Sequence, residues 1–302
     1  MGKPRWVQYK TWSGIAVPGE VEFVQPETTK HMERAVWLTS RLEAPRWGSV
    51  QSYDGAGMSG GLLHNIAVQP RDMAQGSLFA LIREIADDSD ATASSDVQEL
   101  LSGFRRVGWT LALDGKLRFQ DGVLVSGEAI RRVFTPPDGK VPRRGGYYTS
   151  AEIWALRFHN ALSSQLTFRA QTRYAIRWLA AGNKQDELAV YRRFVSPQLD
   201  SCIEVRSPDL PVEIDLAMCV YHSFSVNGPA PAQTALRGAL PHLATPDKFA
   251  KTLIRRLGTS TYGRWHDDPD DKKSRYDATR LAVWRSSYWP TDLAKRLMPK
   301  DL

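Results

Sequence analysis

Apolar residues recur at helical spacing along most of the chain. In residues 26–45 (PETTKHMERAVWLTSRLEAP) they form one face of a helix that ends before Pro45, so Glu43 falls in its last turn. A second helix is predicted over 72–88. From residue 149 onward almost every segment has helical periodicity, which predicts a mostly helical body.

Two stretches interrupt this helical pattern. Residues 50–68 (VQSYDGAGMSGGLLHNIAV) are rich in glycine and predict a small hairpin or two short strands. In 97–145 a short helix is followed by alternating apolar runs around two Asp-Gly turns, which is typical of a β-hairpin. The polar run 89–96 is expected to be a linker. The fold class is therefore α+β, mostly α, with segments 1–96, 97–148 and 149–302.

The net charge is +7 and the isoelectric point is near 9.4. A basic surface favours anionic partners such as nucleic acid, acidic lipid or an anionic cell-wall polymer, although it also serves solubility alone. No helix-turn-helix, aromatic ribonucleoprotein signature or zinc motif is visible, so nucleic acid is not expected as a partner.

The chain has only two cysteines, Cys202 and Cys219. This number excludes a disulfide scaffold and a zinc site built from cysteine pairs. Cys219 lies in the apolar run 214–221, where a buried thiol is expected. The histidines are scattered without metal-ligand spacing, so we expect no structural metal and no cofactor.

The N-terminal residues contain no apolar stretch of signal-peptide length, and no segment is apolar for long enough to span a membrane. We therefore expect synthesis in the cytoplasm without a signal peptide and no membrane insertion.

Two carboxylates flank the start of the glycine-rich stretch. Glu43 ends the first predicted helix, and Asp54 and Ser59 follow in the hairpin. Hydrolysis of a glycosidic bond needs a protonated acid for the leaving oxygen and an ionised carboxylate for the water or the cationic sugar. A helix C-terminus near Trp37 or Trp47 favours the protonated form of an acid, whereas a wet hairpin favours the ionised form. The alternative interpretation is that Glu43 is a solvated helix end, that Asp54 starts a turn and that Ser59 bonds only to backbone.

These residues resemble a known catalytic pattern. LTSRLE at 38–43 followed by DGAGMSGGLLH at 54–64 is similar to the signature of the lysozyme-like superfamily, which includes phage-type and goose-type muramidases and the related bacterial chitosanases. A weaker similarity covers 215–236, which resembles the late core helix of these enzymes. The chain departs from the pattern in the short interval between Glu43 and Asp54 and in having Ser59 where threonine is usual.

The resemblance implies a lysozyme-like fold, in which 1–96 is the N-terminal catalytic lobe, 97–148 is an insertion with a small β element and 149–302 completes the helical domain. It implies that Glu43 is the general acid, that Asp54 is the base or electrostatic partner and that Ser59 positions the water. The expected activity is that of a muramidase acting on peptidoglycan. A lytic transglycosylase and a chitosanase are the alternative enzymes, and a non-catalytic wall-binding part of a phage or secretion apparatus is the alternative of another class.

Other residues are predicted to line the sugar cleft, because sugars stack on aromatic faces and glycine lets a ligand approach the backbone. The predicted substrate-binding residues are Tyr53, Gly57, Gly60, His64, Tyr147, Tyr148, Tyr262 and Trp265. For each of them, ordinary packing or turn formation is the structural alternative.

A wall hydrolase made in the cytoplasm needs a route to its substrate. We expect delivery by a phage holin, a phage tail or a contractile secretion system, so that the protein acts on the cell wall of a target or host cell. An injected antibacterial effector would also need an immunity protein in the cell that produces it.

Overall fold

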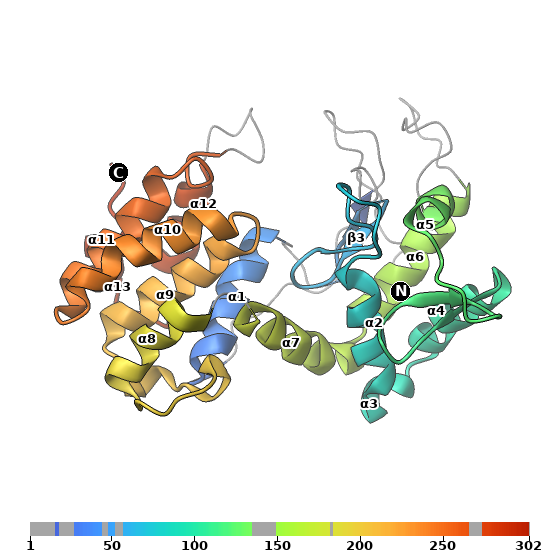
Figure 1. The fold of residues 1–302 in the computed structure, drawn as a ribbon, viewed down its shortest axis with the longest axis horizontal. Coiled ribbons are helices and arrows are strands. Elements are labelled where there is room, and N and C mark those ends of the chain that lie inside the picture. The colour runs from blue at the N-terminus through green and yellow to red at the C-terminus, as the bar shows by residue number, and fades with distance from the viewer. Residues whose placement is uncertain are drawn as a thin grey trace. The chain divides into compact units, whose positions relative to one another are not determined.

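The computed structural model describes residues 16–17, 27–43, 48–51, 57–134, 149–181, 184–265 and 274–301. Most of these residues lie in helices and the strands are short, so the prediction of a mostly α chain with small β elements is confirmed (Figure 1). The chain divides into two compact units. Unit 1 comprises Met1–Phe23 and Glu43–Tyr174, and unit 2 comprises Val24–Leu42 and Ala175–Leu302.

Unit 1 contains a four-stranded antiparallel sheet that follows the order of the chain. Its strands are β1 (Ala16–Val17), β2 (Val50–Gln51), β3 (Ser59–Gly60) and β4 (Asn65–Ile66). In the middle of this sheet, Ser59 pairs with Gln51 on one side and with Ile66 on the other. The glycine-rich stretch therefore forms short paired strands, as its sequence predicts.

The remaining elements of unit 1 are mostly helices. They are α2 (Ser77–Asp87), α3 (Ser89–Thr92), α4 (Ser95–Arg106), the hairpin β5 (Trp109–Leu111) and β6 (Leu117–Phe119), α5 (Gly127–Phe134), α6 (Thr149–Ser163) and the first part of α7 (Gln165–Ala180). The β5–β6 hairpin confirms the hairpin predicted from the Asp-Gly turns, with Gly115 at φ +69° and Gly122 at φ +85°.

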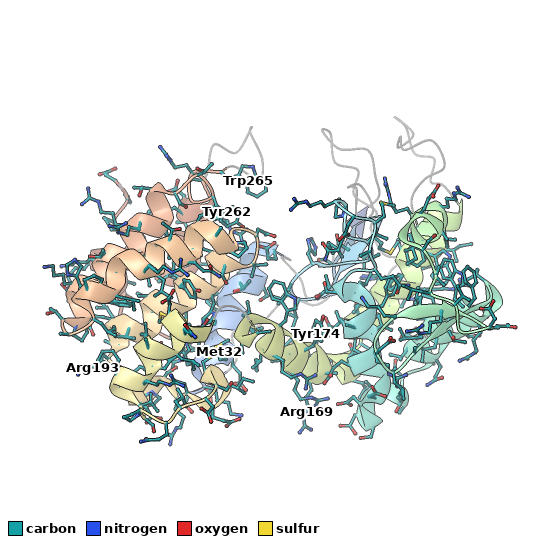
Figure 2. The ribbon with its side chains drawn as sticks, viewed as in Figure 1. Met32, Arg169, Tyr174, Arg193, Tyr262 and Trp265 are labelled. Atoms are coloured by element: carbon teal, nitrogen blue, oxygen red, sulfur yellow. The ribbon has the colours of Figure 1, made fainter. Side chains whose placement is uncertain are left out.

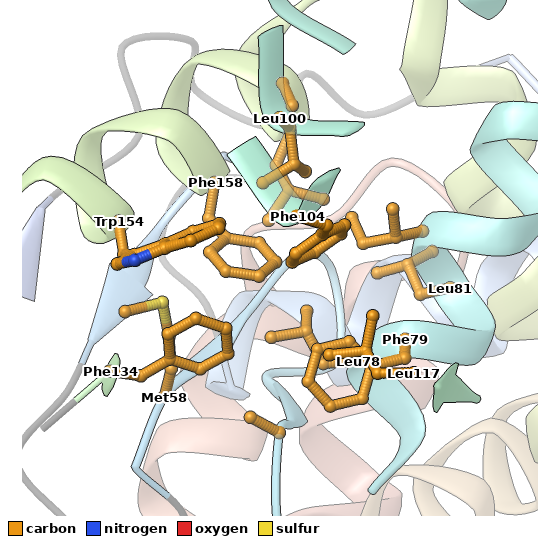
Figure 3. Close-up of a cluster of buried hydrophobic side chains, with 14 of the residues drawn as sticks. Met58, Leu78, Phe79, Leu81, Leu100, Phe104, Leu117, Phe134, Trp154 and Phe158 are labelled. Atoms are coloured by element: carbon orange, nitrogen blue, oxygen red, sulfur yellow. The ribbon is translucent and has the colours of Figure 1, made fainter. Parts of the chain in front are cut away.

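An aromatic cluster forms the core of unit 1 (Figure 3). Phe134 lies at its centre, with ring centroids 5.1 Å from Trp154, 5.4 Å from Phe158 and 6.2 Å from Phe79. Met58, from the loop before β3, is fully buried in the same cluster. Aromatic pairs at these separations add stabilisation beyond the area that they bury.

The two units have other boundaries than the predicted segments 1–96, 97–148 and 149–302. The described part of the predicted insertion shares its core with the residues on both sides of it, because Phe104 and Phe134 pack against Phe79 and Phe158. The helix α5 within this segment was not predicted.

The helix predicted over 72–88 begins later, at Ser77. Residues before it pair with the segment that follows β4, since Gly76 donates its N–H to the carbonyl of Ala67 at 2.8 Å and Val68 forms an isolated bridge with Gln75. Met73 adopts a left-handed backbone at φ +58°, which also interrupts a helix.

The polar run 89–96 is helical for much of its length, and Asp88 organises its start. One carboxylate oxygen of Asp88 accepts the N–H groups of Asp90 and Ala91, both at 3.0 Å, and so caps α3. The other oxygen lies 2.5 Å from the Arg173 guanidinium in α7. The hydrogen bond from Arg173 and those from the backbone hold the pKa of Asp88 below its ordinary value.

Unit 2 is built from helices. They are α1 (His31–Glu43) up to Leu42, the end of α7, α8 (Lys184–Phe194), η1 (Cys202–Glu204), η2 (Ser207–Asp209), α9 (Val212–Ser225), α10 (Pro229–Ala239), η3 (Leu240–His242), α11 (Pro246–Thr259), α12 (Arg275–Trp284) and α13 (Thr291–Leu297). The helix α9 is buried from Ile214 to Phe224 and packs against α10 and α11. Among the described helices, none has the length and apolar character needed to cross a membrane.

Candidate functional site

Glu43 is the last residue of α1, which confirms its predicted place at the end of that helix. Its side chain is half-buried. The preceding turns bury Trp37, whose ring packs edge-on against Tyr288 at a centroid distance of 5.2 Å. Trp47 lies outside the described residues.

The sheet that follows α1 holds Ser59 at the start of its strand β3. A Cβ built on Gly60 would lie 3.0 Å from Leu162, which belongs to the core of unit 1. Because neighbouring side chains of a strand point to opposite faces, Ser59 points to the other face of the sheet.

Ser59 is only 1% exposed, and its hydroxyl has no hydrogen-bond partner among the described residues. A buried hydroxyl without a partner is uncommon in native proteins, and an ordered water or a ligand usually explains it. The hydroxyl can both donate and accept a hydrogen bond, so it is suited to hold a water molecule. This environment is compatible with the predicted role of Ser59.

Backbone conformation and packing explain why glycine occurs at several positions of this segment. Gly57 and Gly61 have positive φ angles of +75° and +77°, a conformation that other residues rarely adopt. A Cβ on Gly61 would approach Leu81 to 2.8 Å. For Gly60 the structure gives a packing reason, its closeness to Leu162. The predicted contact of Gly57 and Gly60 with a sugar stays a prediction.

His64 closes the turn between β3 and β4. Its N–H donates to the carbonyl of Gly61 at 3.0 Å, and its own backbone is left-handed at φ +47°. Part of the residue reaches solvent, but its Nε2 atom is buried and has no partner within the ranges that the structure describes. Burial lowers the pKa of His64 to about 4, so the imidazole is neutral at neutral pH.

Sequence reasoning missed Gln171 of α7. Its side chain is buried and its Nε2 donates to the carbonyl of Leu162 at 2.7 Å. Its Oε1 has no partner in the described part of the chain and would lie 3.0 Å from a Cβ on Gly61. Ser59, His64 and Gln171 thus place unpartnered polar atoms in or beside the β3–β4 segment. No sequence signal separated Gln171 from other helical glutamines.

Several predicted site residues fall elsewhere. Asp54, Tyr53, Tyr147 and Tyr148 lie outside the described residues. Tyr262 and Trp265 belong to unit 2, where their rings stack at a centroid distance of 5.9 Å (Figure 2).

The surroundings of these two rings differ. Phe224 meets the Tyr262 ring edge-on at 5.8 Å, and the Arg275 guanidinium lies 5.4 Å from its centre, so Tyr262 has a packing role. Trp265 is 48% exposed and leaves part of its indole to solvent.

The most extensive buried hydrogen-bond network of the described residues lies in unit 2, and sequence reasoning missed it. Asp215 of α9 is its first member. Its carboxylate lies 2.8 Å from His31 Nδ1, 3.2 Å from the Arg34 guanidinium and 2.6 Å from the Trp289 indole nitrogen. Burial alone would raise the pKa of Asp215, but the hydrogen bond from His31 and the charge of Arg34 hold it below its ordinary value.

The network continues through Tyr191 of α8. Its hydroxyl lies 2.8 Å from His31 Nε2 and 3.0 Å from His222 Nε2. His222 Nε2 in turn lies 3.3 Å from Glu187 Oε1, and the Cys202 thiol donates to the same oxygen at 3.2 Å. Burial raises the pKa of Tyr191 well above its ordinary value, so its hydroxyl keeps its proton.

One sequence signal does point to this network. Asp215, Cys219 and His222 recur at helical spacing along α9, so they share one face of that helix. Cys219 is buried and forms no disulfide, as predicted.

A cavity of about 680 Å³ lies in unit 1, away from the predicted chemistry. Residues 72–75 and 124–128, with Lys116 and Arg131, form its walls. None of the predicted site residues lines it.

Comparisons of the chain with protein-family models, with curated proteins and with solved structures found no significant match.

Proposed function

We propose that this protein is a muramidase that hydrolyses the β-1,4 glycosidic bonds of peptidoglycan. The proposal depends most on one observation. The helix α1 ends at Glu43 and is followed in the chain by strands β2–β4 of a small antiparallel sheet, and strand β3 begins with Ser59, whose buried hydroxyl has no partner among the described residues. The helix α2 follows this sheet. This order supports the lysozyme-like resemblance of residues 38–64.

The proposed mechanism divides the work between two carboxyl groups. Glu43 gives its proton to the glycosidic oxygen while the bond from that oxygen to the anomeric carbon breaks. Asp54 and Ser59 hold a water molecule, which adds to the anomeric carbon and loses its proton to Asp54. The Ser59 hydroxyl has no hydrogen-bond partner among the described residues, so it can bind this water, which supports its role in the step.

The charge of the chain favours peptidoglycan over chitosan. A protein with a net charge of +7 is attracted to an anionic wall and is repelled by a cationic polymer. The partly exposed indole of Trp265 adds a flat apolar face, which we propose as a further contact with wall sugars.

Digestion of purified peptidoglycan, with mass analysis of the released fragments, tests the proposal. The wild-type chain should release fragments with reducing ends. Glu43→Gln should lower the rate by about 10²–10⁴-fold, because the amide has no proton to give to the leaving oxygen. Glu33→Gln, a change in the first turn of the same helix, is the matched control and should keep the activity.

Each alternative gives a different product. Anhydro ends, together with full activity of Asp54→Asn, would identify a lytic transglycosylase. Faster release from chitosan than from peptidoglycan would identify a chitosanase. Binding to the wall without release of fragments would identify a non-catalytic wall-binding protein. Full lysis by Glu43→Gln would contradict the enzymatic proposal as a whole.

A further inference from the structure

Unit 2 brings together three side chains of the kinds that bind transition metals. Glu187 comes from α8, Cys202 from η1 and His222 from α9, and all three are buried. His222 Nε2 lies 3.3 Å from Glu187 Oε1, and Cys202 Sγ lies 3.2 Å from the same oxygen. The three donor atoms all lie within 4.8 Å of one another.

These separations, 3.2 and 3.3 Å, are close to the spacing of donor atoms around a metal ion. A tetrahedral zinc ion with bonds of about 2.0–2.3 Å to nitrogen, oxygen and sulfur places neighbouring donor atoms about 3.3–3.6 Å apart. From this geometry we infer that Glu187, Cys202 and His222 bind a divalent transition metal ion of the zinc type. Thiolate and imidazole favour such an ion over magnesium or calcium.

The hydroxyl of Tyr191 offers a fourth oxygen at this site. It lies 3.0 Å from His222 Nε2, close to the spacing of neighbouring donors around a metal. When the ion binds, the thiol proton of Cys202 leaves to solvent and the sulfur binds as thiolate. The hydroxyl of Tyr191 keeps its second contact, with His31 at 2.8 Å.

A cavity of unit 2 borders one of the three proposed ligands. A space of about 320 Å³ in unit 2 has an apolar wall from Trp178, Leu179 and Val226, and Glu187 and Tyr221 also line it. Of the three proposed ligands, Glu187 alone lines this cavity.

A second group of similar composition serves as an internal comparison. His31, Asp215 and Cys219 are also buried with their donor atoms close together. There the guanidinium of Arg34 lies 3.2 Å from the carboxylate of Asp215 and already supplies positive charge. The indole N–H of Trp289 donates a hydrogen bond to the same carboxylate at 2.6 Å. We therefore assign the metal to the group around Glu187 alone.

The test uses the purified full-length chain, reduced and treated with a chelator, and titrated with Co²⁺ as the probe. A thiolate-to-cobalt charge-transfer band that saturates at one ion per chain is the expected result. Cys202→Ser should remove the band and Cys219→Ser should keep it. Absence of the band in the wild-type chain, or its loss in Cys219→Ser alone, would overturn the proposal.

A second measurement needs no variant. Zn²⁺ should slow the alkylation of Cys202 at least tenfold in the wild-type chain, with little change at Cys219, as read by mass spectrometry of peptides. Equal protection of both cysteines, or of neither, would contradict the assignment. The inference does not depend on the proposed wall hydrolysis, because both readouts are independent of activity.

Discussion

Units 1 and 2 differ in how their buried polar side chains are connected. In unit 2, Asp215, His31, Tyr191, His222 and Glu187 contact one another in a continuous hydrogen-bonded series. In unit 1 the core is an aromatic cluster, and the hydroxyl of Ser59, Nε2 of His64 and Oε1 of Gln171 have no partners among the residues that the structure describes.

Buried polar side chains affect stability in two different ways. A connected network stabilises one arrangement of its helices, whereas leaving a buried polar atom without a partner costs free energy. Such atoms also occur in unit 2, as in the hydroxyl of Ser223, so the lack of a partner does not by itself indicate a ligand. The unpartnered atoms of Ser59, His64 and Gln171 are distinguished by their place in or beside the β3–β4 segment, which belongs to the proposed site, and the following experiments test this comparison.

The largest effect is expected in the aromatic core of unit 1. Phe134→Ala should lower the free energy of unfolding by about 3–5 kcal/mol, because it leaves a cavity among Trp154, Phe158 and Phe79. Hydrogen exchange read by mass spectrometry should show faster exchange in unit 1 and unchanged protection in unit 2. Phe119→Ala, at a partly exposed ring, is the control. Equal loss of protection in both units would contradict the prediction that the change destabilises unit 1 alone.

The next effect concerns pH. The pKa of His64 is about 4 in the folded chain and near 6.5 in an unfolded one, so the unfolded state binds more protons between these values. Stability should therefore rise with pH across this window, by up to roughly 3 kcal/mol. Asparagine tolerates the left-handed backbone at position 64, so His64→Asn should remove the pH dependence of stability in urea unfolding curves. His242→Asn should leave it unchanged, and a wild-type curve that is flat from pH 4 to 6.5 would refute the assignment.

A smaller effect is expected in the network of unit 2. Tyr191→Phe keeps the ring but removes the hydroxyl between His31 and His222, and should cost about 1–3 kcal/mol of unfolding free energy. Tyr276→Phe is the matched control, since its hydroxyl makes a hydrogen bond to the carbonyl of Pro299 near the end of the chain. Urea denaturation should rank Tyr191→Phe as the more destabilised; the opposite ranking would argue against a cooperative network.

The smallest effect on stability is expected at Ser59. Ser59→Ala removes a hydroxyl that has no partner in the described ranges, so stability should change by less than about 1 kcal/mol. Peptidoglycan hydrolysis should fall about tenfold, the value of one lost hydrogen bond to the attacking water. Ser223→Ala removes a similarly buried hydroxyl in unit 2 and should keep the activity. A stability loss without a loss of activity would give Ser59 a purely structural role.

Much of the helical content could be predicted because it depends on local periodicity. The helix ending at Glu43 and the Asp-Gly hairpin around Gly115 are set by neighbours in sequence. The predicted start of α2 was wrong because Gly76 pairs with Ala67 and is not part of the helix. Such pairings depend on the folded chain and produce no periodic pattern in the sequence.

The site was only partly accessible to sequence reasoning. Glu43 and Ser59 belong to one continuous motif, so a pattern of residue types could identify them. The cluster of Glu187, Cys202 and His222 is assembled from three separate elements, and the spacing between its members has no meaning until the chain is folded. Of these, His222 alone shared a recognisable helical face with Asp215 and Cys219.

Position 88 in unit 1 tolerates few substitutions, because Asp88 has two structural roles. The same carboxylate caps α3 and holds Arg173 of α7. Asparagine would keep the cap and lose the charge, and glutamate would keep the charge with a side chain too long for the cap. In a set of related sequences, position 88 should therefore vary less than its exposed neighbours, and a change there should be accompanied by a change at Arg173.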